Sequence, residues 1–442
     1  MKAIFLANIG NSDIGKNRKS LFTSRGQENN VYEKTKEIYE KGGFDDLDAI
    51  ILEPIISEVK KDYEIKKIYL FATEQDPINI QDTKYSGKII KEILKKKFGF
   101  KDEIFKERII NRNPSDYDEV LKYYQDEINT IVLDKNINNV FFSITGGIPA
   151  QNTSLLLEVA SNFGLKAQAI YVSRYSGVVK KYKIGEIIYK NLLTQRVEEL
   201  EKMCLYDAAA NLSEQFDLKK PNEIKWLRAK ASRDLFDFDR SLSILNEIKD
   251  SFSEPEKNEC LKEIADIEKV KDKKDMKALI KELYENMKRR WEQGAYADFI
   301  GRLFRFEEAV LRFIVEREYK ISTDINEKGD FPIFVTFIKD EKNAGLKNFL
   351  ARAKINIENP QPNRKTLYYI LRYIITQHNG DSELENVGFV LGKIENLGEI
   401  RNKSILAHGF DGVSKEKIVE KYKSDELMKD IEKIVNFIQN KY

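Results

Sequence analysis

A permanent cation, a carboxamide and a titratable imidazole lie within the segment Arg401-Asn402-Lys403-Ser404-Ile405-Leu406-Ala407-His408. The surrounding residues favour a helix, and Gly409 is suited to a helix end. A seven-residue step is about 700° of helical turn, so Arg401 and His408 would lie within about 20° on one face, about 10.5 Å apart along the axis. Such a set can cleave RNA without a metal ion, because Arg stabilises a phosphate, His transfers a proton and the 2′-hydroxyl of the RNA is the nucleophile.

The chain has only two histidines, and the other one, His378, also follows an arginine, Arg372. A polar residue after Arg401 and a glycine directly after His408 favour the later pair as the candidate site. We interpret Arg372 and His378 as ordinary helix surface. For Arg401 and His408 a second interpretation stays open, namely a surface ion pair or a cap at a helix C-terminus, where a cationic His is favourable.

Length and composition limit the classes of protein that need to be considered. A chain of 442 residues predicts two or three domains, and a net charge of +2 means that any RNA site must be a local patch. Cys204 and Cys260 are too few for a disulfide framework, and two cysteines with two histidines make no zinc site, so we expect neither metal nor cofactor. The apolar start is too short for a signal peptide and no segment approaches a membrane span, so we expect a cytoplasmic protein.

The first part of the chain alternates between short apolar runs and helical stretches, which predicts a doubly wound, Rossmann-like α/β domain over 1–188. The runs are β-branched or aromatic and bounded by polar residues, as expected for buried parallel strands. The expected strands are 2–7, 67–73, 139–145 and 167–173, with a last hairpin strand over 178–184, and the expected helices are 84–97, 115–131 and 150–163.

Strand signals vanish after this domain, and Lys and Glu alternate with apolar residues at helical spacing. We expect an all-helical connector over 189–285, with a long charged spacer helix as the alternative, and an all-helical domain over 286–442. A helix over 296–319 is apolar on more than one face and should be buried in a bundle or a dimer interface. The residues expected to form part of the connector core are Trp226, Leu227, Leu235, Phe236 and Phe238. The apolar positions of 296–319 are Phe299, Ile300, Leu303, Phe304, Phe306, Ala309, Val310, Phe313 and Ile314. Further helices are expected over 366–378, 385–408 (with a break at Gly398) and 414–441.

Two polar loops follow predicted strands and predict a ligand site in the first domain. In an open α/β sheet ligands bind beyond the carboxyl ends of the strands, and glycines let backbone N–H groups approach a phosphate. The second loop has neither the Gly-Lys-Ser/Thr of a P-loop nor a G-x-G-x-x-G pattern, so ATP hydrolysis and NAD chemistry are disfavoured. Tight strand-to-helix turns are the alternative, and it is favoured for Gly10 considered alone. The residues predicted to contact the ligand are Gly10, Asn11, Ser12 and Asp13 in the first loop, and Thr145, Gly146, Gly147, Gln151 and Asn152 in the second.

A third strand end, at Phe71-Ala72-Thr73-Glu74-Gln75-Asp76, is a weaker candidate. Its polar residues, Thr73 first among them, would contribute to the rim of the same site or form an ordinary loop. Lys84, Tyr85, Ser86 and Lys88 follow, and they suit either phosphate contacts or a solvated helix start.

The order of these parts resembles a known family. An N-terminal α/β domain with the loop Ser-Ile-Thr-Gly-Gly-Ile-Pro-Ala-Gln-Asn, a helical connector and a C-terminal helical domain ending in Arg-Asn-x5-His is similar to the CARF–HEPN ancillary ribonucleases of type III CRISPR systems, closest to the Csm (III-A) branch. The resemblance covers essentially the whole chain. Residues 296–316, with Arg302, Arg305, Phe306, Glu307 and Glu308, also resemble a family helix that packs behind the active site.

The resemblance implies an endoribonuclease of antiviral defence whose 286–442 region is a HEPN-like domain. In that family the first domain binds a cyclic oligoadenylate across a homodimer interface, and the dimeric second domain then cleaves single-stranded RNA without metal. The catalytic residues fall on Arg401, Asn402 and His408, and the ligand loops on 10–13 and 145–152. Some members also cut their activator slowly in the first domain, where Ser12, Thr145 and Asn152 would be near.

Two alternatives remain beside the ligand-activated ribonuclease. One is a nucleotide-sensing regulator whose helical domain only contacts partners or nucleic acid. The other is an unregulated ribonuclease toxin of the same helical class. The small net charge argues against a DNA-binding regulator, and the loop 145–152 argues against the toxin, which needs no ligand pocket.

Overall fold

The computed structural model describes residues 1–22, 30–131, 136–173, 176–272, 275–326, 329–378 and 380–441. The chain forms two compact units, Met1–Arg196 and Val197–Tyr442. The first is an α/β unit and the second is all-helical, as the sequence predicts. The finer division at residues 188 and 285 stays a prediction.

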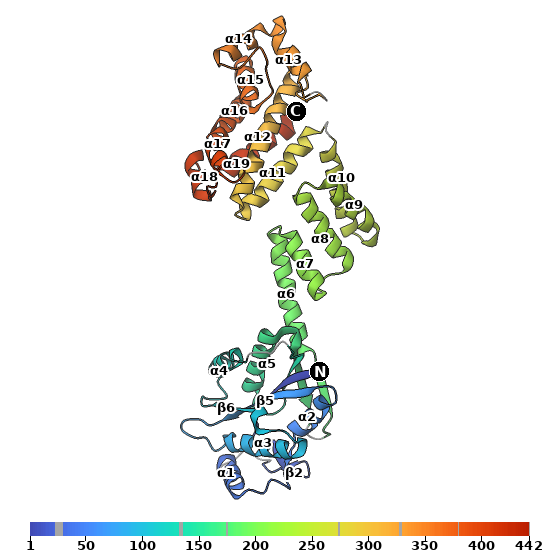
Figure 1. Ribbon diagram of the computed structural model, residues 1–442, viewed down its shortest axis with the longest axis vertical. Coiled ribbons are helices and arrows are strands. Elements are labelled where there is room, and N and C mark those ends of the chain that lie inside the picture. Colours follow the sequence, from blue (N-terminus) through green and yellow to red (C-terminus); the bar gives the residue numbers. More distant parts are fainter. Residues whose placement is uncertain are drawn as a thin grey trace. The chain divides into compact units, whose positions relative to one another are not determined.

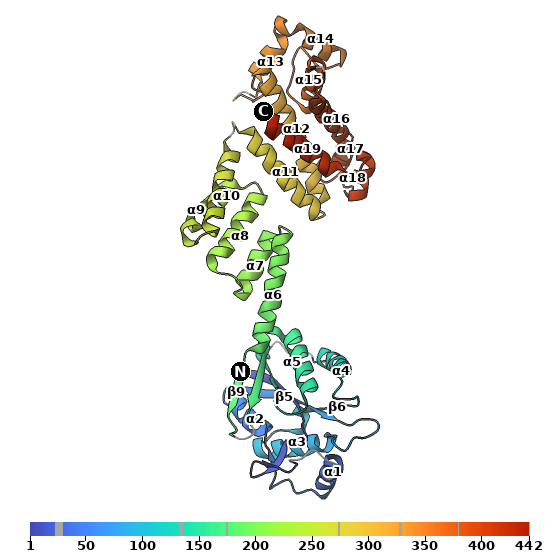
Figure 2. The same ribbon diagram turned by 180° about the vertical axis from the view of Figure 1, so that it is seen from behind.

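A six-stranded sheet in the order β6-β5-β1-β7-β8-β9 forms the centre of the first unit (Figure 1). Neighbouring strands are parallel except for β8 and β9, which pair antiparallel at one edge, and β9 leads into the long helix α6 (Figure 2). The strands are β1 (Lys2–Asn8), β5 (Glu64–Thr73), β6 (Phe105–Ile110), β7 (Asn139–Ser143), β8 (Ala167–Val172) and β9 (Val179–Tyr182).

The central strand β1 is buried on both faces, which explains its unbroken apolar sequence. Phe5 and its same-side neighbours pack with α2 (Leu52–Lys60) and α3 (Lys84–Phe98). Ile4 and Leu6 face the other way, toward α4 (Tyr117–Asn129) and α5 (Pro149–Phe163). Helices therefore cover both faces of the sheet, and the predicted doubly wound, Rossmann-like fold is confirmed.

Several elements of this unit carry no clear sequence signal. The edge strand β6 reads Phe-Lys-Glu-Arg-Ile-Ile, and its charged middle residues are only half-buried, as is common at sheet edges. A second, three-stranded sheet has strands of two or three residues, too short for a periodicity. These strands are β2 (Ile14–Lys16), β3 (Lys19–Ser20) and β4 (Asp48–Ala49), and helix α1 (Val31–Lys41) follows β3 in the chain.

The second unit begins with short helices that pack around small apolar clusters. Leu227 is buried and Trp226, Phe236 and Phe238 are partly buried, as expected for a helical core. The expectation for Leu235 is wrong: it is the C-cap residue of α8 and is 72% exposed. The helices are α6 (Ile184–Lys202), α7 (Tyr206–Phe216), α8 (Pro221–Asp234), α9 (Phe238–Ile248) and α10 (Glu256–Lys271), the first of which begins in the α/β unit.

The C-terminal helices surround α12 (Tyr296–Tyr319). All nine of its predicted apolar positions are buried, so the expected buried helix is confirmed. The expected helix over 414–441 is wrong, because Lys423 takes a left-handed conformation and separates two helices. The other helices are α11 (Met276–Glu292), α13 (Pro332–Lys339), α14 (Ala344–Arg352), α15 (Arg364–Gln377), α16 (Ser382–Glu395), α17 (Gly398–Lys403), α18 (Lys415–Tyr422) and α19 (Leu427–Lys441). In the parts of the chain that the structure describes, no helix is both long and apolar enough to span a bilayer.

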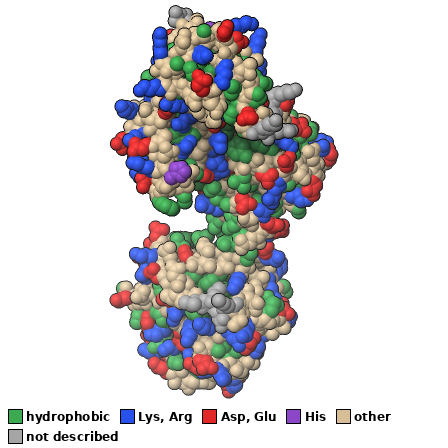
Figure 3. Space-filling view, turned by 45° about the horizontal axis from the view of Figure 1, so that its top comes forward, with side chains coloured by type: hydrophobic (Ala, Val, Ile, Leu, Met, Phe, Trp, Pro, Cys, Tyr) green, Lys and Arg blue, Asp and Glu red, His purple; other side chains and the backbone are tan. Residues whose placement is uncertain are grey.

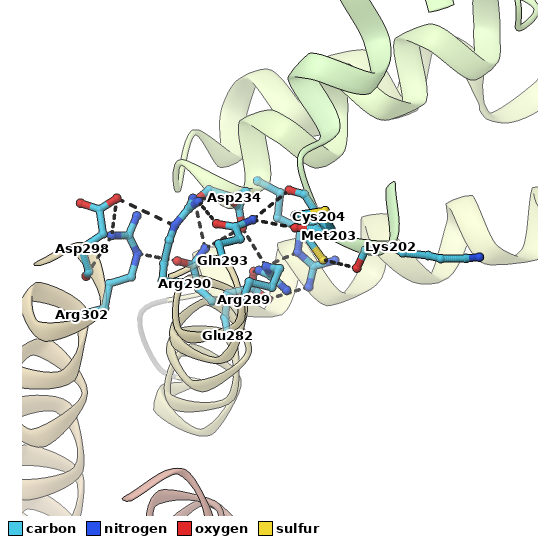
Figure 4. Close-up of polar contacts among 12 residues, drawn as sticks. Lys202, Met203, Cys204, Asp234, Glu282, Arg289, Arg290, Gln293, Asp298 and Arg302 are labelled. Atoms are coloured by element: carbon cyan, nitrogen blue, oxygen red, sulfur yellow. Dashed lines mark hydrogen bonds and ion pairs between the residues drawn. The ribbon is translucent and has the colours of Figure 1, made fainter. Parts of the chain in front are cut away.

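A buried polar cluster joins α8 to α11 and α12 (Figure 4). Asp234, 6% exposed, accepts a hydrogen bond from Arg289 Nε at 2.7 Å and pairs with Arg290. The Nδ2 of Asn286 donates to the carbonyl of Asp234 at 2.9 Å, and its Oδ1 accepts from Arg302. Since a buried charge is costly unless it is paired, these contacts fix the end of α8 against the first turns of α12.

Candidate functional site

The two predicted ligand loops meet at the carboxyl edge of the sheet, after β1 and β7. A Cβ on Gly10 would lie 2.8 Å from the backbone nitrogen of Gly147, and one on Gly146 would lie 2.7 Å from Asp13 Oδ2. Gly146 and Gly147 also have φ of 93° and 64°, in the left-handed region that favours glycine. Close packing of the loops therefore requires all three glycines, and backbone conformation also requires Gly146 and Gly147.

A network of buried side chains, which the sequence did not predict, holds both loops from the interior of the α/β unit. Asn8 Nδ2 donates to Asn152 Oδ1 at 2.9 Å, and Asn8 Oδ1 accepts from the hydroxyl of Tyr124 on α4. Asn152 Nδ2 in turn donates to the carbonyl of Gly146 at 2.7 Å. Burial raises the pKa of Tyr124, so its hydroxyl stays protonated as a donor. Asn152 therefore braces the loop from within.

The other polar residues of the two loops are also held by local contacts. Gly10 N donates to Asp13 Oδ2 at 2.7 Å, and Asp13 is almost fully buried. Asn11 Nδ2 donates to Gln81 Oε1 at 2.7 Å, and Ser12 Oγ donates to Asn11 Oδ1 at 3.1 Å. The Asn11–Gln81 bond ties the first loop to the segment after β5, and the other two bonds hold the loop internally.

The second loop is held in the same way. Thr145 Oγ1 accepts from the backbone N–H of Val172 at 3.0 Å, and Gln151 Oε1 accepts from that of Ile148 at 3.0 Å. Gln151 is 2% exposed, and its Nε2 has no hydrogen-bond partner within the described part of the chain. The predicted residues of both loops thus lie at one edge of the sheet, while their contacts to a ligand stay a prediction.

The polar residues at the third strand end are held by contacts within the chain. The hydroxyls of Thr73 and Thr83 each accept a backbone N–H of the other residue, at 3.1 and 3.0 Å, and Thr73 is 5% exposed. Lys84 pairs with Glu74 at 2.7 Å. Burial opposes the charge on Glu74, yet hydrogen bonds from Lys84 and Tyr32 outweigh it and lower its pKa. The structure thus gives Thr73 and Lys84 structural partners, and their predicted ligand contacts remain untested.

The expectation that Arg401 and His408 share one continuous helix is wrong. Helix α17 ends at Lys403, and Ser404 has an extended conformation with φ −86° and ψ 169°. The Oγ of Ser404 donates to the carbonyl of Arg401 at 2.8 Å and accepts from the N–H of Leu406 at 3.3 Å. A serine side chain that binds nearby backbone groups competes with helical hydrogen bonding, which accounts for the early end.

The chain after Ser404 folds back on itself and returns His408 to the start of the segment. The N–H of His408 donates to the carbonyl of Asn402 at 3.3 Å. A Cβ on Gly409 would lie 2.0 Å from the carbonyl oxygen of Lys403. Gly409 is thus required by this close approach and not by the left-handed helix end that its position suggests. Asn402 and His408 are exposed and Arg401 is half-buried. The tight turn keeps these predicted residues close together.

Arg401 and a second arginine, Arg364, lie against the same aromatic ring on α12. Its guanidinium is 5.1 Å from the ring centre of Phe304 on α12, and the guanidinium of Arg364 is 4.5 Å from the same ring. Arg364 also forms an ion pair with Glu307 at 3.3 Å. Burial raises the pKa of Glu307 to about 7, against the opposing effect of Arg364 and, more weakly, of Arg401. Phe304 and Glu307 lie on the helix expected behind the site, but nothing in the sequence marks Arg364.

The other histidine has an ordinary surface environment, as interpreted from the sequence. His378 is the C-cap residue of α15, is exposed, and its Nε2 lies 2.6 Å from Glu318 Oε1. In the described part of the chain, no three His, Cys, Asp or Glu side chains are grouped so as to hold a metal ion. The metal independence of any reaction remains a prediction.

Comparison with known proteins identifies the helical region. Residues 266–442 match the family model of the Cas_Csm6 HEPN domain. Residues 266–442 are therefore a HEPN domain of the Csm6 type. The structure of Enterococcus italicus Csm6 bound to cyclic hexa-2′-fluoro-hexa-dAMP is similar over 99% of this chain and 93% of that one, with a TM-score of 0.52 and 14% sequence identity. No curated protein matches the chain. The chain thus has the fold of Csm6 over nearly its whole length, and the resemblance to the Csm branch of CARF–HEPN proteins is confirmed.

Two adjacent tyrosines test the network beneath the loops. We expect Tyr124→Phe to lower the free energy of unfolding by about 1–3 kcal/mol, because Asn8 Oδ1 loses its donor in a fully buried position. The matched control is Tyr123→Phe: this hydroxyl is buried without a hydrogen-bond partner among the described residues, so its removal should change stability little or raise it. Urea unfolding followed by circular dichroism measures both, and equal effects would contradict the assigned network.

Proposed function

We propose that the chain is an endoribonuclease that cleaves single-stranded RNA without metal when a cyclic oligoadenylate binds its N-terminal unit, acting in type III CRISPR antiviral defence. The observation that carries the proposal is the tight turn that returns His408 to Asn402 beside the half-buried Arg401, within the region that matches the Csm6 HEPN domain. The similar Enterococcus protein is bound to cyclic hexa-2′-fluoro-hexa-dAMP, which supports the choice of activator.

The chemistry follows from the three residue types. Arg401 holds the scissile phosphate and stabilises the charge that develops on it, and Asn402 positions the pair or donates to the phosphate. The 2′-hydroxyl attacks phosphorus and loses its proton, while the 5′-oxygen leaves and gains one. His408 serves one of these transfers as base or acid. The products are a 2′,3′-cyclic phosphate, or its opened form, and a 5′-hydroxyl.

A homodimer is part of the proposal. The turn beside Arg401 exposes Ile405 (73%) and Phe410 (94%), apolar side chains next to a polar site, as expected where a second copy covers the surface. Each copy would supply one Arg401 and one His408 to a shared cleft. On the face shown in Figure 3 acidic and basic side chains are intermingled, consistent with local rather than global attraction of RNA.

The whole proposal is tested by one cleavage assay. We expect a fluorogenic single-stranded RNA to be cut when a cyclic tetra- or hexa-adenylate is added, and cutting to persist in excess EDTA. DNA of the same sequence should survive, because it lacks the nucleophile. Activity that is lost in EDTA and restored by Mg²⁺ or Mn²⁺ would indicate a carboxylate–metal nuclease instead, and cleavage that ignores the activator would favour the unregulated toxin.

Substitution of each histidine distinguishes the catalytic one. His408→Ala and Arg401→Ala should each reduce cleavage by about 10³-fold or more, since they remove proton transfer and charge stabilisation, while folding and activator binding persist. His378→Ala is the control and should keep most activity, because this side chain pairs only with Glu318 in the described structure. An inactive His378→Ala with an active His408→Ala would show that the wrong histidine was chosen.

Substitutions in the second loop test the activator site. Gly147→Trp has no room, since even a Cβ would lie 2.7 Å from Gln151 Oε1, and Asn152→Ala removes the bonds to Asn8 and Gly146. Both should weaken activator binding and raise the activator concentration needed for half-maximal cleavage, because an activator must bind the active arrangement more tightly than the resting one. Basal cleavage should be unchanged. Calorimetric titration that shows wild-type affinity in both variants would place the ligand site elsewhere.

A further inference from the structure

Two arginines share one aromatic ring beside the proposed RNA site. The guanidiniums of Arg364 and Arg401 lie 4.5 and 5.1 Å from the ring centre of Phe304, as in cation–π contacts. A Cβ on Gly398, the first residue of α17, would lie 3.7 Å from Arg364 Nη2, so the start of α15 lies against the helix that carries Arg401. Two cations this close repel each other unless an anion compensates them.

The compensating anion is Glu307, one turn beyond Phe304 on α12. Its carboxylate is 1% exposed and lies 3.3 Å from Arg364, and it also attracts Arg401. The geometry of this pair is poor for hydrogen bonding: Glu307 Oε2 and Arg364 Nη1 are both buried without a hydrogen-bond partner among the described residues. Such a carboxylate adds little to the stability of the fold, because the free-energy cost of removing it from water is about as large as the gain from its ion pair.

We propose that Glu307 and Arg364 are positioning residues of the ribonuclease site: together with Phe304 they hold the guanidinium of Arg401 in the orientation that binds the scissile phosphate. This inference rests on the proposed function. It assigns a role to two residues that do not themselves touch RNA. When Glu307 is neutral, Arg364 and Arg401 repel without compensation and Arg401 leaves its place over the ring.

The protonation of Glu307 should therefore set how well the site works. Its pKa of about 7 arises from burial, which raises it, with Arg364 of α15 and Arg401 of α17 lowering it and Glu395 of α16 and Glu308 of α12 raising it. Because the carboxyl is charged above its pKa, Arg401 is held at higher pH and released as the pH falls through about 7.

Glu307→Gln imitates the protonated carboxyl at every pH. The ratio of wild-type to variant kcat then isolates the effect of Glu307, because the other titrating groups are the same in both proteins. At about pH 8.5 we expect kcat to be about 10- to 100-fold below wild type, with KM changed by less than about threefold, since only the alignment in the transition state is lost. At about pH 5.5 the ratio of wild type to variant should approach one. Glu308→Gln is the matched control: this neighbouring carboxylate pairs with Arg312 at 3.0 Å and should leave the ratio flat.

A purely structural role would lower the melting temperature of Glu307→Gln but leave the ratio of kcat values independent of pH, and that result would overturn the proposal. If Glu307→Gln does not fold, Phe304→Leu must reproduce the fall in kcat at about constant KM, because it removes the ring that contacts Arg401. Normal kcat in this variant would equally overturn the proposal.

The Arg401 Nε resonance provides a readout that needs no RNA. We expect its chemical shift to follow the protonation of Glu307, with a midpoint near pH 7 in the wild type, and to show no such change in Glu307→Gln. A protein without ribonuclease activity but with this titration would refute the proposed function alone, whereas a resonance that does not respond to pH in the wild type would refute the positioning role.

Discussion

The pairing of buried charge is the constraint on which the helical unit depends. Helix α12 is surrounded by other helices on nearly all sides, yet it carries Arg302 and Glu307 as well as apolar residues. In such surroundings an unpaired charge costs several kcal/mol, so Arg302 and Glu307 each need a partner from a neighbouring helix. Asn286 of α11 meets Arg302, and Arg364 of α15 meets Glu307. Apolar packing alone would allow α12 to rotate or slide, whereas these contacts select one orientation.

In the α/β unit, buried polar groups also need partners, but here the groups are uncharged. Asn8 stands at the end of a strand that is buried on both faces, and its amide is satisfied by Tyr124 on one side and Asn152 on the other. The position of the glycine-containing loop after β7 is thereby coupled to α4, although none of the predicted ligand residues lies on that helix. A polar network of this kind specifies one loop conformation because every alternative leaves a buried donor or acceptor unpaired.

The sequence was sufficient wherever burial alone decides structure. The apolar positions of α12 and the strands β1, β7 and β8 were predicted because their residues are buried on more than one face, and the two loops were expected together because parallel strands end at one edge. It failed where a local side chain overrides periodicity, as Ser404 does when it ends α17 before His408. It also could not reveal Tyr124 or Arg364, because their partners lie far away in the chain and no spacing rule connects them.

The Arg–His segment has a different conformation from the one that its sequence predicts. A helix would place His408 about two turns beyond Arg401, whereas the turn after Ser404 brings the backbone of His408 to Asn402. What the proposed reaction requires is that a cation and an imidazole reach one phosphate, and the tight turn brings the backbone of His408 back to that of Asn402, which a helix would not do. The turn is in turn held by α12, because Leu406 lies against Gly301, where a Cβ would be 3.2 Å from its Cδ1. The same helix thus supports Arg401 through Phe304 and the His408 turn through Gly301, while its first turns are tied to α8 through Arg302 and Asn286. A displacement of α8 that moved α12 as a rigid rod would therefore reach both halves of the candidate site.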